Sequence, residues 1–149
     1  MSEELRQKGY LDKRGKANGD PVGAYEGFNI GATTIDQLRR ASIIPDRDYG
    51  RFKKNKPDGI VVDRRSSAPE VKFLVEYKDI GGLDSESRKK YFLDKVAEEY
   101  CRPLLCSFAA VSDSHHRTSW IFVTDRDWEE IRREDDYPLD TRTDLASTM

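Results

Sequence analysis

Cysteine and long apolar runs are both scarce in this sequence. It contains only two cysteines, Cys101 and Cys106, which are too few for a disulfide framework. The most apolar stretch, 104–111, is far shorter than the ~20 residues that a membrane-spanning helix needs. The first residues, MSEELRQK, carry acids where a signal peptide has an apolar segment. These absences predict a cytoplasmic protein with reduced thiols and no membrane association.

Two common kinds of site are also missing from the sequence. It has no GxxxxGK(S/T) loop, so nothing in the chain predicts nucleotide hydrolysis. His115 and His116 follow the two cysteines at a spacing that fits no usual zinc site. The net charge of −2 gives no general attraction to nucleic acid, although the first half of the chain is basic and the second half acidic. A polyanion can therefore still approach one side of the molecule.

The composition that remains is that of a small folded domain. Charged residues and hydrophobic residues each make up 36% of the 149 residues, which predicts one domain over 1–149 with a thin core. Six of the ten glycines fall within 1–32, where no hydrophobic period is sustained. We therefore expect a loosely ordered N-terminal segment there, and a polar tail or linker at 136–149.

Periodicity and capping residues predict seven elements in the order α-β-β-α-β-β-α. Thr34 and Gln37 have the spacing of a capping box, which predicts the start of a helix that Pro45 closes. Asp84 can cap the second helix, and Thr124 with Asp127 can form a capping box for the last one. The remaining patterns predict strands at 59–63 and 71–78, a helix at 85–100, strands at 104–111 and 119–125, and a short helix at 126–134.

One group of charged residues stands out at the first two strands. Residues two apart on a strand share a face, so Glu76 and Lys78 point the same way. A hairpin centred on Ser67 pairs residues whose numbers sum to 134, which sets Asp58 opposite Glu76 and Asp63 opposite Val71. Opposed carboxylates ~4.5–5.5 Å apart at their Cβ atoms need a cation between them, and Mg²⁺ suits such a pair.

These residues and their order resemble the PD-(D/E)xK, or restriction-endonuclease-like, nuclease superfamily. Pro57-Asp58 and Glu76-Tyr77-Lys78 match its motif, and the elements over 33–124 follow its core order. The stretches TTIDQLRRA, KPDGIVVD and FLVEYKD look most like the N-terminal nuclease domains of restriction–modification polypeptides. The resemblance implies an α/β fold, with a mixed β-sheet of about four strands flanked by helices.

The resemblance also assigns roles to individual residues. It implies that Asp58, Glu76 and the backbone carbonyl of Tyr77 bind Mg²⁺, with Mn²⁺ as a substitute, and that Lys78 is the catalytic lysine. Many members of the superfamily carry a further acid near the first helix, and the stretch NIGATT has none. Glu26 and Asp36 are the candidate auxiliary acids that could replace it.

Two basic clusters are candidate contacts to nucleic acid. The first precedes Pro57 and the second lies in the first turns of the helix at 85–100, where cations oppose the helix dipole. Each could instead be an ordinary solvated surface. The residues are Arg51, Lys53, Lys54 and Lys56 in the first cluster, and Arg88, Lys89 and Lys90 in the second.

The sequence thus leads to one principal functional hypothesis and two rivals. The principal one is a Mg²⁺-dependent DNA endonuclease. A second is a catalytically inactive relative that binds nucleic acid or a partner protein. A third makes the chain the nuclease module of a longer restriction–modification system, with other domains, subunits or a homodimer as partners. Taken singly, Asp58 could be a turn residue, and Glu76 with Lys78 an exposed cross-strand charge pair.

Overall fold

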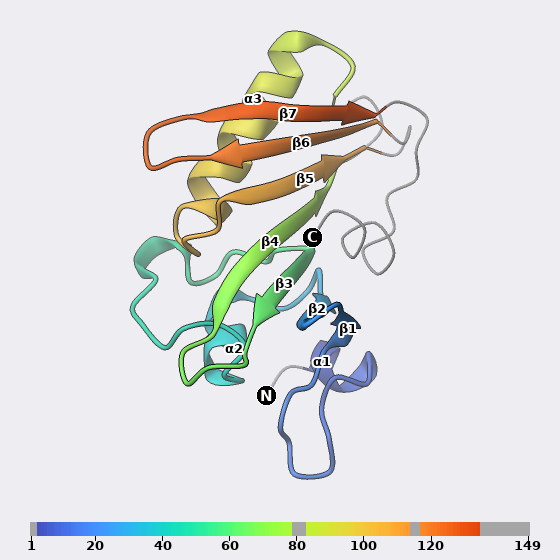
Figure 1. The fold of residues 1–149 in the computed structure, drawn as a ribbon, viewed down its shortest axis with the longest axis vertical. Coiled ribbons are helices and arrows are strands. Elements are labelled where there is room, and N and C mark those ends of the chain that lie inside the picture. Colours follow the sequence, from blue (N-terminus) through green and yellow to red (C-terminus); the bar gives the residue numbers. More distant parts are fainter. Residues whose placement is uncertain (1–2, 79–82, 114–116, 135–149) are drawn as a thin grey trace.

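One seven-stranded sheet dominates the fold, as the computed structural model shows for residues 3–78, 83–113 and 117–134 (Figure 1). The strands lie in chain order from β1 to β7, and the described residues form only three α-helices, all short. The expectation of a four-stranded sheet flanked by helices is therefore wrong. The strands are β1 (Asp20–Val22), β2 (Tyr25–Asn29), β3 (Gly59–Asp63), β4 (Glu70–Tyr77), β5 (Phe108–Ser112), β6 (Thr118–Val123) and β7 (Trp128–Glu134).

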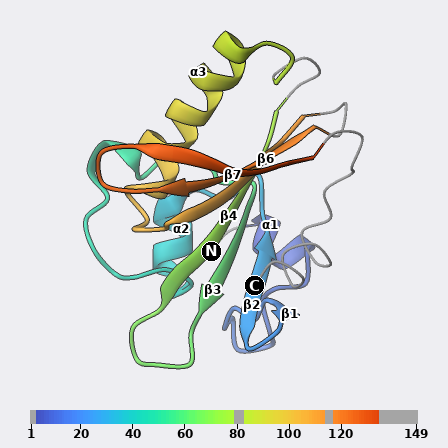
Figure 2. The same ribbon diagram turned by 45° about the horizontal axis from the view of Figure 1, so that its top comes forward.

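The helices are α1 (Glu3–Gln7), α2 (Ile35–Arg40) and α3 (Glu86–Val96). Every neighbouring pair of strands is antiparallel except β4 and β5, which are parallel and joined through α3. In the two ribbon views, α2 and α3 lie on the same side of the sheet (Figures 1 and 2). Among the described residues, no helix is both long and apolar enough to cross a membrane.

The β3–β4 hairpin confirms two of the predicted strands. Gly59 pairs with Val75 and Ile60 with Leu74, which is the register that the sequence predicts. The register then shifts by one residue between Val61 and Val62, where β4 carries a bulge. Asp63 consequently pairs with Glu70, so the prediction that it faces Val71 is wrong.

Helix α2 begins with the predicted capping box. The Thr34 hydroxyl accepts a hydrogen bond from the Gln37 N–H at 3.1 Å, and the Gln37 side chain accepts one from the Thr34 N–H at 2.9 Å. The helix ends at Arg40, before the predicted stop at Pro45. Ser42 has a φ of 60°, a left-handed conformation that cannot continue a right-handed helix.

Helix α3 confirms the predicted helix at 85–100, with two differences in detail. Its cap is Ser85, whose hydroxyl accepts a hydrogen bond from the Arg88 N–H at 3.2 Å, and not Asp84. Beyond Val96 the chain continues as a π-helical turn, η2 (Ala97–Cys101). That turn carries Tyr100 toward the end of β4, where the candidate site lies.

The predicted helix at 126–134 is wrong, because residues 128–134 form strand β7 and residues 126–127 lie in the turn before it. The Thr124 hydroxyl does accept a hydrogen bond from the Asp127 N–H, at 3.0 Å. This contact closes the turn between β6 and β7 instead of starting a helix, and the Thr124 N–H donates to the Asp127 carbonyl at 2.9 Å. Charged residues along this edge strand discourage pairing with another chain.

The N-terminal segment expected to be loosely ordered contributes α1, β1 and β2 to the fold. Close packing explains two of its glycines. A Cβ on Gly19 would lie 2.8 Å from the Gly27 carbonyl and from the Phe28 ring, and a Cβ on Gly27 would lie 2.8 Å from the Val22 side chain. The predicted polar tail at 136–149 lies outside the described residues.

The sheet has a different core on each face. Leu74 belongs to the larger cluster, together with Leu38 of α2 and Leu93 of α3. Val75, its neighbour in β4, belongs to a smaller cluster on the opposite face that includes Trp120. Because side chains alternate along a strand, Glu76 shares the helix-side face with Leu74.

Candidate active site

Asp58 and Glu76 lie side by side at one end of the β3–β4 hairpin. The Asp58 N–H donates a hydrogen bond to Glu76 Oε1 at 3.0 Å, and the Tyr77 N–H donates one to Asp58 Oδ2 at 2.8 Å. Each carboxylate is therefore held by the backbone of the other strand. The predicted adjacency of the two acids is confirmed, whereas their role as metal ligands stays a prediction.

The environment of Glu76 disfavours a negative charge on its side chain. The residue is 3% exposed, and its burial together with the nearby Asp58 raises its pKa from 4.5 to about 9. The charge of Lys78 and the hydrogen bond from the Asp58 N–H lower the pKa, but they do not outweigh burial. This environment therefore favours the protonated form of Glu76.

Lys78 brings a positive charge to the same face. Its ammonium Nζ lies 5.3 Å from the centre of the Phe92 ring of α3, a cation–π distance. Its backbone N–H donates to the Ser112 carbonyl of β5 at 2.7 Å, which fixes the end of β4 against the parallel strand. The Lys78 charge is close enough to lower the pKa of Glu76, so two acids and one cation lie near the end of β4 that α3 covers.

Gly31 is a neighbour of Asp58 that sequence reasoning missed. A Cβ built on Gly31 would lie 3.1 Å from Asp58 Oδ1, which is closer than ordinary van der Waals contact. The Asp58 carbonyl also accepts a hydrogen bond from the Ile30 N–H at 2.7 Å. The segment before α2 therefore approaches the Asp58 carboxylate with bare backbone.

Tyr100 is a second neighbour that the sequence did not reveal as part of the site. Burial and the negative charges of Glu76, Glu99 and Asp58 raise the pKa of its phenol to about 12. Its helical spacing with Phe92 and Val96 indicated only a packing role. A tyrosine on an apolar helix face also carries a hydroxyl group that needs polar surroundings. This was the one feature of the sequence that pointed to a place for Tyr100 near polar residues.

Neither candidate auxiliary acid offers a free carboxylate to Asp58. Glu26 forms an ion pair with Arg64 at 2.8 Å, and it pairs in the sheet with Val62, at the opposite end of β3 from Asp58. Asp36 is bound by Arg39 at 3.0 Å and by Arg40 at 2.8 Å. The Glu26 pair also keeps the pKa of that carboxyl below its ordinary value, despite its partial burial.

The basic loop at 51–56 is fixed between α2 and η2. The carbonyls of Asn55 and Lys53 accept the N–H groups of Ile35 and Asp36 at 2.8 and 2.9 Å, and the Asn55 side-chain amide donates to the Glu99 carbonyl at 3.0 Å. Arg51 pairs with Glu98 at 3.4 Å. Within the described part of the chain, Lys53, Lys54 and Lys56 are exposed and form no ion pair.

The second basic cluster is divided by the fold. Lys89 is only 8% exposed and forms an ion pair with Glu130 of β7 at 2.5 Å. Lys90 pairs with Asp94 at 2.8 Å, one turn along α3. Arg88 is exposed, and of the three it is the one with no ion pair to another described residue. Lys89 is thus committed to holding α3 against β7.

The donor set at this site is small and made of oxygen. No group of three or more His, Cys, Asp or Glu side chains in the described ranges is placed to hold a metal ion. Two carboxylates are nevertheless enough for Mg²⁺, which keeps several waters and needs few protein ligands. His115 and His116, the histidines weighed for zinc, lie outside the described residues.

Comparison of the chain with family models, with curated proteins and with solved structures gives no match.

Proposed function

We propose that this protein is a cytoplasmic, Mg²⁺-dependent endonuclease that hydrolyses phosphodiester bonds in DNA. The observation that carries the proposal is the direct contact of Asp58 with the Glu76 strand end, on the same face as the Lys78 ammonium. The resemblance of these three residues to the PD-(D/E)xK motif supports it. An unrelated pair of surface charges would not need an acid that is 3% exposed.

The residues fit the chemistry of a divalent cation. Asp58, Glu76 and the Tyr77 carbonyl would hold Mg²⁺ or Mn²⁺, leaving the other positions for water and a phosphate oxygen. The bound cation would activate a water molecule and offset charge on the phosphate. Lys78, whose ammonium lies above the Phe92 ring, would stabilise the negative charge that develops during the reaction.

The loop at 51–56 supplies the complementary surface for a phosphate backbone. Lys53, Lys54 and Lys56 are exposed and lead directly to Pro57 and Asp58. The hydrogen bonds from α2 and to the Glu99 carbonyl hold the loop in place, so its charges stay close to the site. Phosphate contacts of this kind position nucleic acid without reading its sequence.

The decisive experiment is a cleavage assay on plasmid and single-stranded DNA with Mg²⁺ or with EDTA. Cleavage by the wild type should require Mg²⁺. Asp58→Asn should abolish it while leaving the fold intact, because the amide oxygen can still accept the hydrogen bond from the Tyr77 N–H. Asp63→Asn, at the far end of β3, is the matched control and should cleave normally. Equal cleavage by Asp58→Asn and the wild type would refute the proposal.

A competing proposal is a catalytically inactive module that binds nucleic acid or a protein. The observation that favours it is that Glu26 and Asp36 are both engaged by arginines, leaving the site with two acids among the described residues. DNA that is retained in a gel-shift assay but stays intact with Mg²⁺ and Mn²⁺ would support this alternative.

The third proposal places the chain within a larger restriction–modification assembly. One site per chain cuts one strand in each encounter, so efficient double-strand cleavage would require pairing of two chains. Conversion of plasmid directly to the linear form, with a rate that rises with the square of protein concentration, would support a dimer. Nicked circles formed at a rate proportional to protein concentration would argue against it.

A further inference from the structure

Helix α3 carries an aromatic residue between two cations on its solvent side. Arg88, Tyr91 and Lys95 occur at positions i, i+3 and i+7, a spacing that places them along one face of a helix. All three are exposed, and Tyr91 is 62% exposed. We call these three residues the α3 stripe.

The α3 stripe is connected to the candidate site through Phe92. The Tyr91 and Phe92 rings pack edge to face with centres 5.4 Å apart. The Phe92 ring in turn lies 5.3 Å from Lys78 Nζ. Two successive ring contacts therefore lead from the ammonium of the candidate site to the exposed ring of Tyr91.

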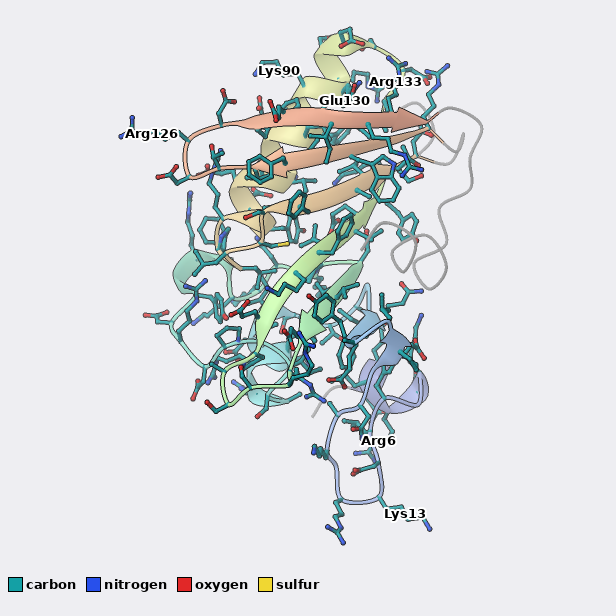
Figure 3. The ribbon with its side chains drawn as sticks, viewed as in Figure 1. Arg6, Lys13, Lys90, Arg126, Glu130 and Arg133 are labelled. Atoms are coloured by element: carbon teal, nitrogen blue, oxygen red, sulfur yellow. The ribbon has the colours of Figure 1, made fainter. Side chains whose placement is uncertain are left out.

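The charges of α3 are sorted between its two flanks. On the flank that faces β7, Asp94 binds Lys90 at 2.8 Å and accepts a hydrogen bond from the Trp128 indole at 2.6 Å, and Lys89 binds Glu130 at 2.5 Å. Figure 3 shows Lys90, Glu130 and Arg133 at this end of the molecule. In the described ranges, Arg88 and Lys95 form no ion pair, so the stripe keeps its positive charge.

We infer that the α3 stripe binds a single-stranded segment of nucleic acid, with a base stacked on Tyr91 and phosphates at Arg88 and Lys95. This inference rests on the proposed nuclease function, and it adds the class of substrate. Bases in a duplex are already stacked on one another, so a ring on a convex helix surface can stack only on an unpaired base. The cations alone would serve either form of nucleic acid.

Binding measurements in EDTA test this inference without requiring catalysis. The probes are a labelled oligothymidylate and a blunt-ended, fully paired duplex of equal charge, titrated with the full chain. Tyr91→Ala should weaken binding of the single strand on the order of 10-fold to 100-fold, the scale for one stacked base. It should leave duplex binding unchanged, and Tyr91→Phe should retain the preference. Phe108→Ala, an aromatic that is 41% exposed in strand β5, is the matched control and should bind like the wild type.

The cations of the stripe should leave a different signature. For the single strand, Arg88→Gln and Lys95→Gln should each reduce the slope of log affinity against log salt concentration by about 0.7. Tyr91→Ala should not change this slope. Thermal unfolding of Arg88→Gln and Lys95→Gln should match that of the wild type, because both side chains are exposed, and Tyr91→Ala should lose only the ring contact with Phe92 and stay folded.

Two results would overturn the inference. One is a wild type that does not prefer the single strand over the duplex, and the other is a Tyr91→Ala variant that binds the single strand like the wild type. If DNA is cleaved with Mg²⁺ and Tyr91→Ala behaves as the wild type, the inference fails and the proposed function stands. If Tyr91 governs single-strand binding but no DNA is cleaved, the proposed function fails and the stripe stands.

Discussion

Glu76→Gln should make the protein more stable, and by an amount that grows with pH. Gln has nearly the shape of a protonated Glu, and its oxygen can accept the hydrogen bond that the Asp58 N–H now gives to Glu76 at 3.0 Å. Its amide can also donate to the Asp58 carboxylate. The variant therefore keeps the geometry of the pair and removes only the titration of Glu76.

The magnitude follows from the difference in pKa between the folded and unfolded states. Burial and the charge of Asp58 raise the pKa of Glu76 to about 9, against 4.5 in the unfolded chain. Between pH 4.5 and 9 the folded state therefore binds more protons at Glu76 than the unfolded state does. The stability that this proton binding gives is complete below pH 4.5 and is lost as the pH rises toward 9. The free energy of unfolding of the wild type should therefore fall, relative to that of Glu76→Gln, as the pH rises from 6 to 8, with a slope of at most about 1.4 kcal/mol per pH unit.

Urea unfolding followed by tryptophan fluorescence measures this difference directly. Wild type and Glu76→Gln are compared at pH 6, 7 and 8 in EDTA, and the denaturant slope checks that both unfold in the same way. Glu70→Gln is the matched control, because it makes the same substitution at the exposed start of β4. Parallel stability curves for wild type and Glu76→Gln would refute the argument that Glu76 holds a proton at neutral pH.

Adding Mg²⁺ extends the same experiment to the candidate site. A cation that takes the place of the proton should stabilise the wild type more at pH 8 than at pH 6, because less proton has to be displaced. Glu76→Gln should gain less from Mg²⁺ at both values. An identical gain for the two proteins would mean that Mg²⁺ does not use Glu76.

Three further outcomes are expected. Lys78→Ala should keep Mg²⁺ binding but slow DNA cleavage by on the order of 10²–10³, and cleavage at the wild-type rate would remove Lys78 from catalysis. Gly31→Ala places a methyl group where a Cβ lies 3.1 Å from Asp58 Oδ1, so Mg²⁺ affinity measured by calorimetry should fall on the order of tenfold. Unchanged affinity would show that Asp58 can move aside. Lys53→Gln should lower the slope of log affinity for duplex DNA against log salt by about 0.9. Lys13→Gln, at an exposed lysine in the turn after α1 (Figure 3), should not, and equal slopes for the two variants would make the loop an ordinary solvated surface.

Local sequence signals predicted the central elements of the fold well. The β-branched run at 59–63 and the apolar run at 71–78 do form a hairpin, and Thr34 does cap a helix through Gln37. Such signals depend on neighbours within a few residues, so no tertiary contact was needed to read them. They could not fix the number of strands, because that depends on contacts between distant segments.

The wrong predictions have this tertiary origin in common. Trp128 and Ile131 have a spacing that suits a helix, yet pairing with β6 and the indole contact to Asp94 place this segment in the sheet. Gly19 and Gly27 look like markers of a loose segment, but they are small because other parts of the chain pack against them. Propensity is a weak guide where packing decides.

The candidate site was predictable in part because the bulge in the β3–β4 hairpin lies beyond Val61. The register between Gly59 and Val75 is undisturbed, so the facing of Asp58 and Glu76 followed from counting residues. Gly31 and Tyr100 reach the same place through other elements, and no count along the chain relates them to Asp58. The burial of Lys89 likewise depends on Glu130, which the sequence had assigned to a helix.

The paired acids are easier to explain by a ligand than by the fold. Burying an acid at 3% exposure beside a second carboxylate costs stability, because a proton must be bound or a charge left without its hydration. A glutamine at position 76 and an asparagine at 58 could accept the same backbone hydrogen bonds without that cost. A purely structural role would therefore favour the amides. Two carboxylates can bind a divalent cation as amides cannot, so the proposed Mg²⁺ site would offset the cost of burying them.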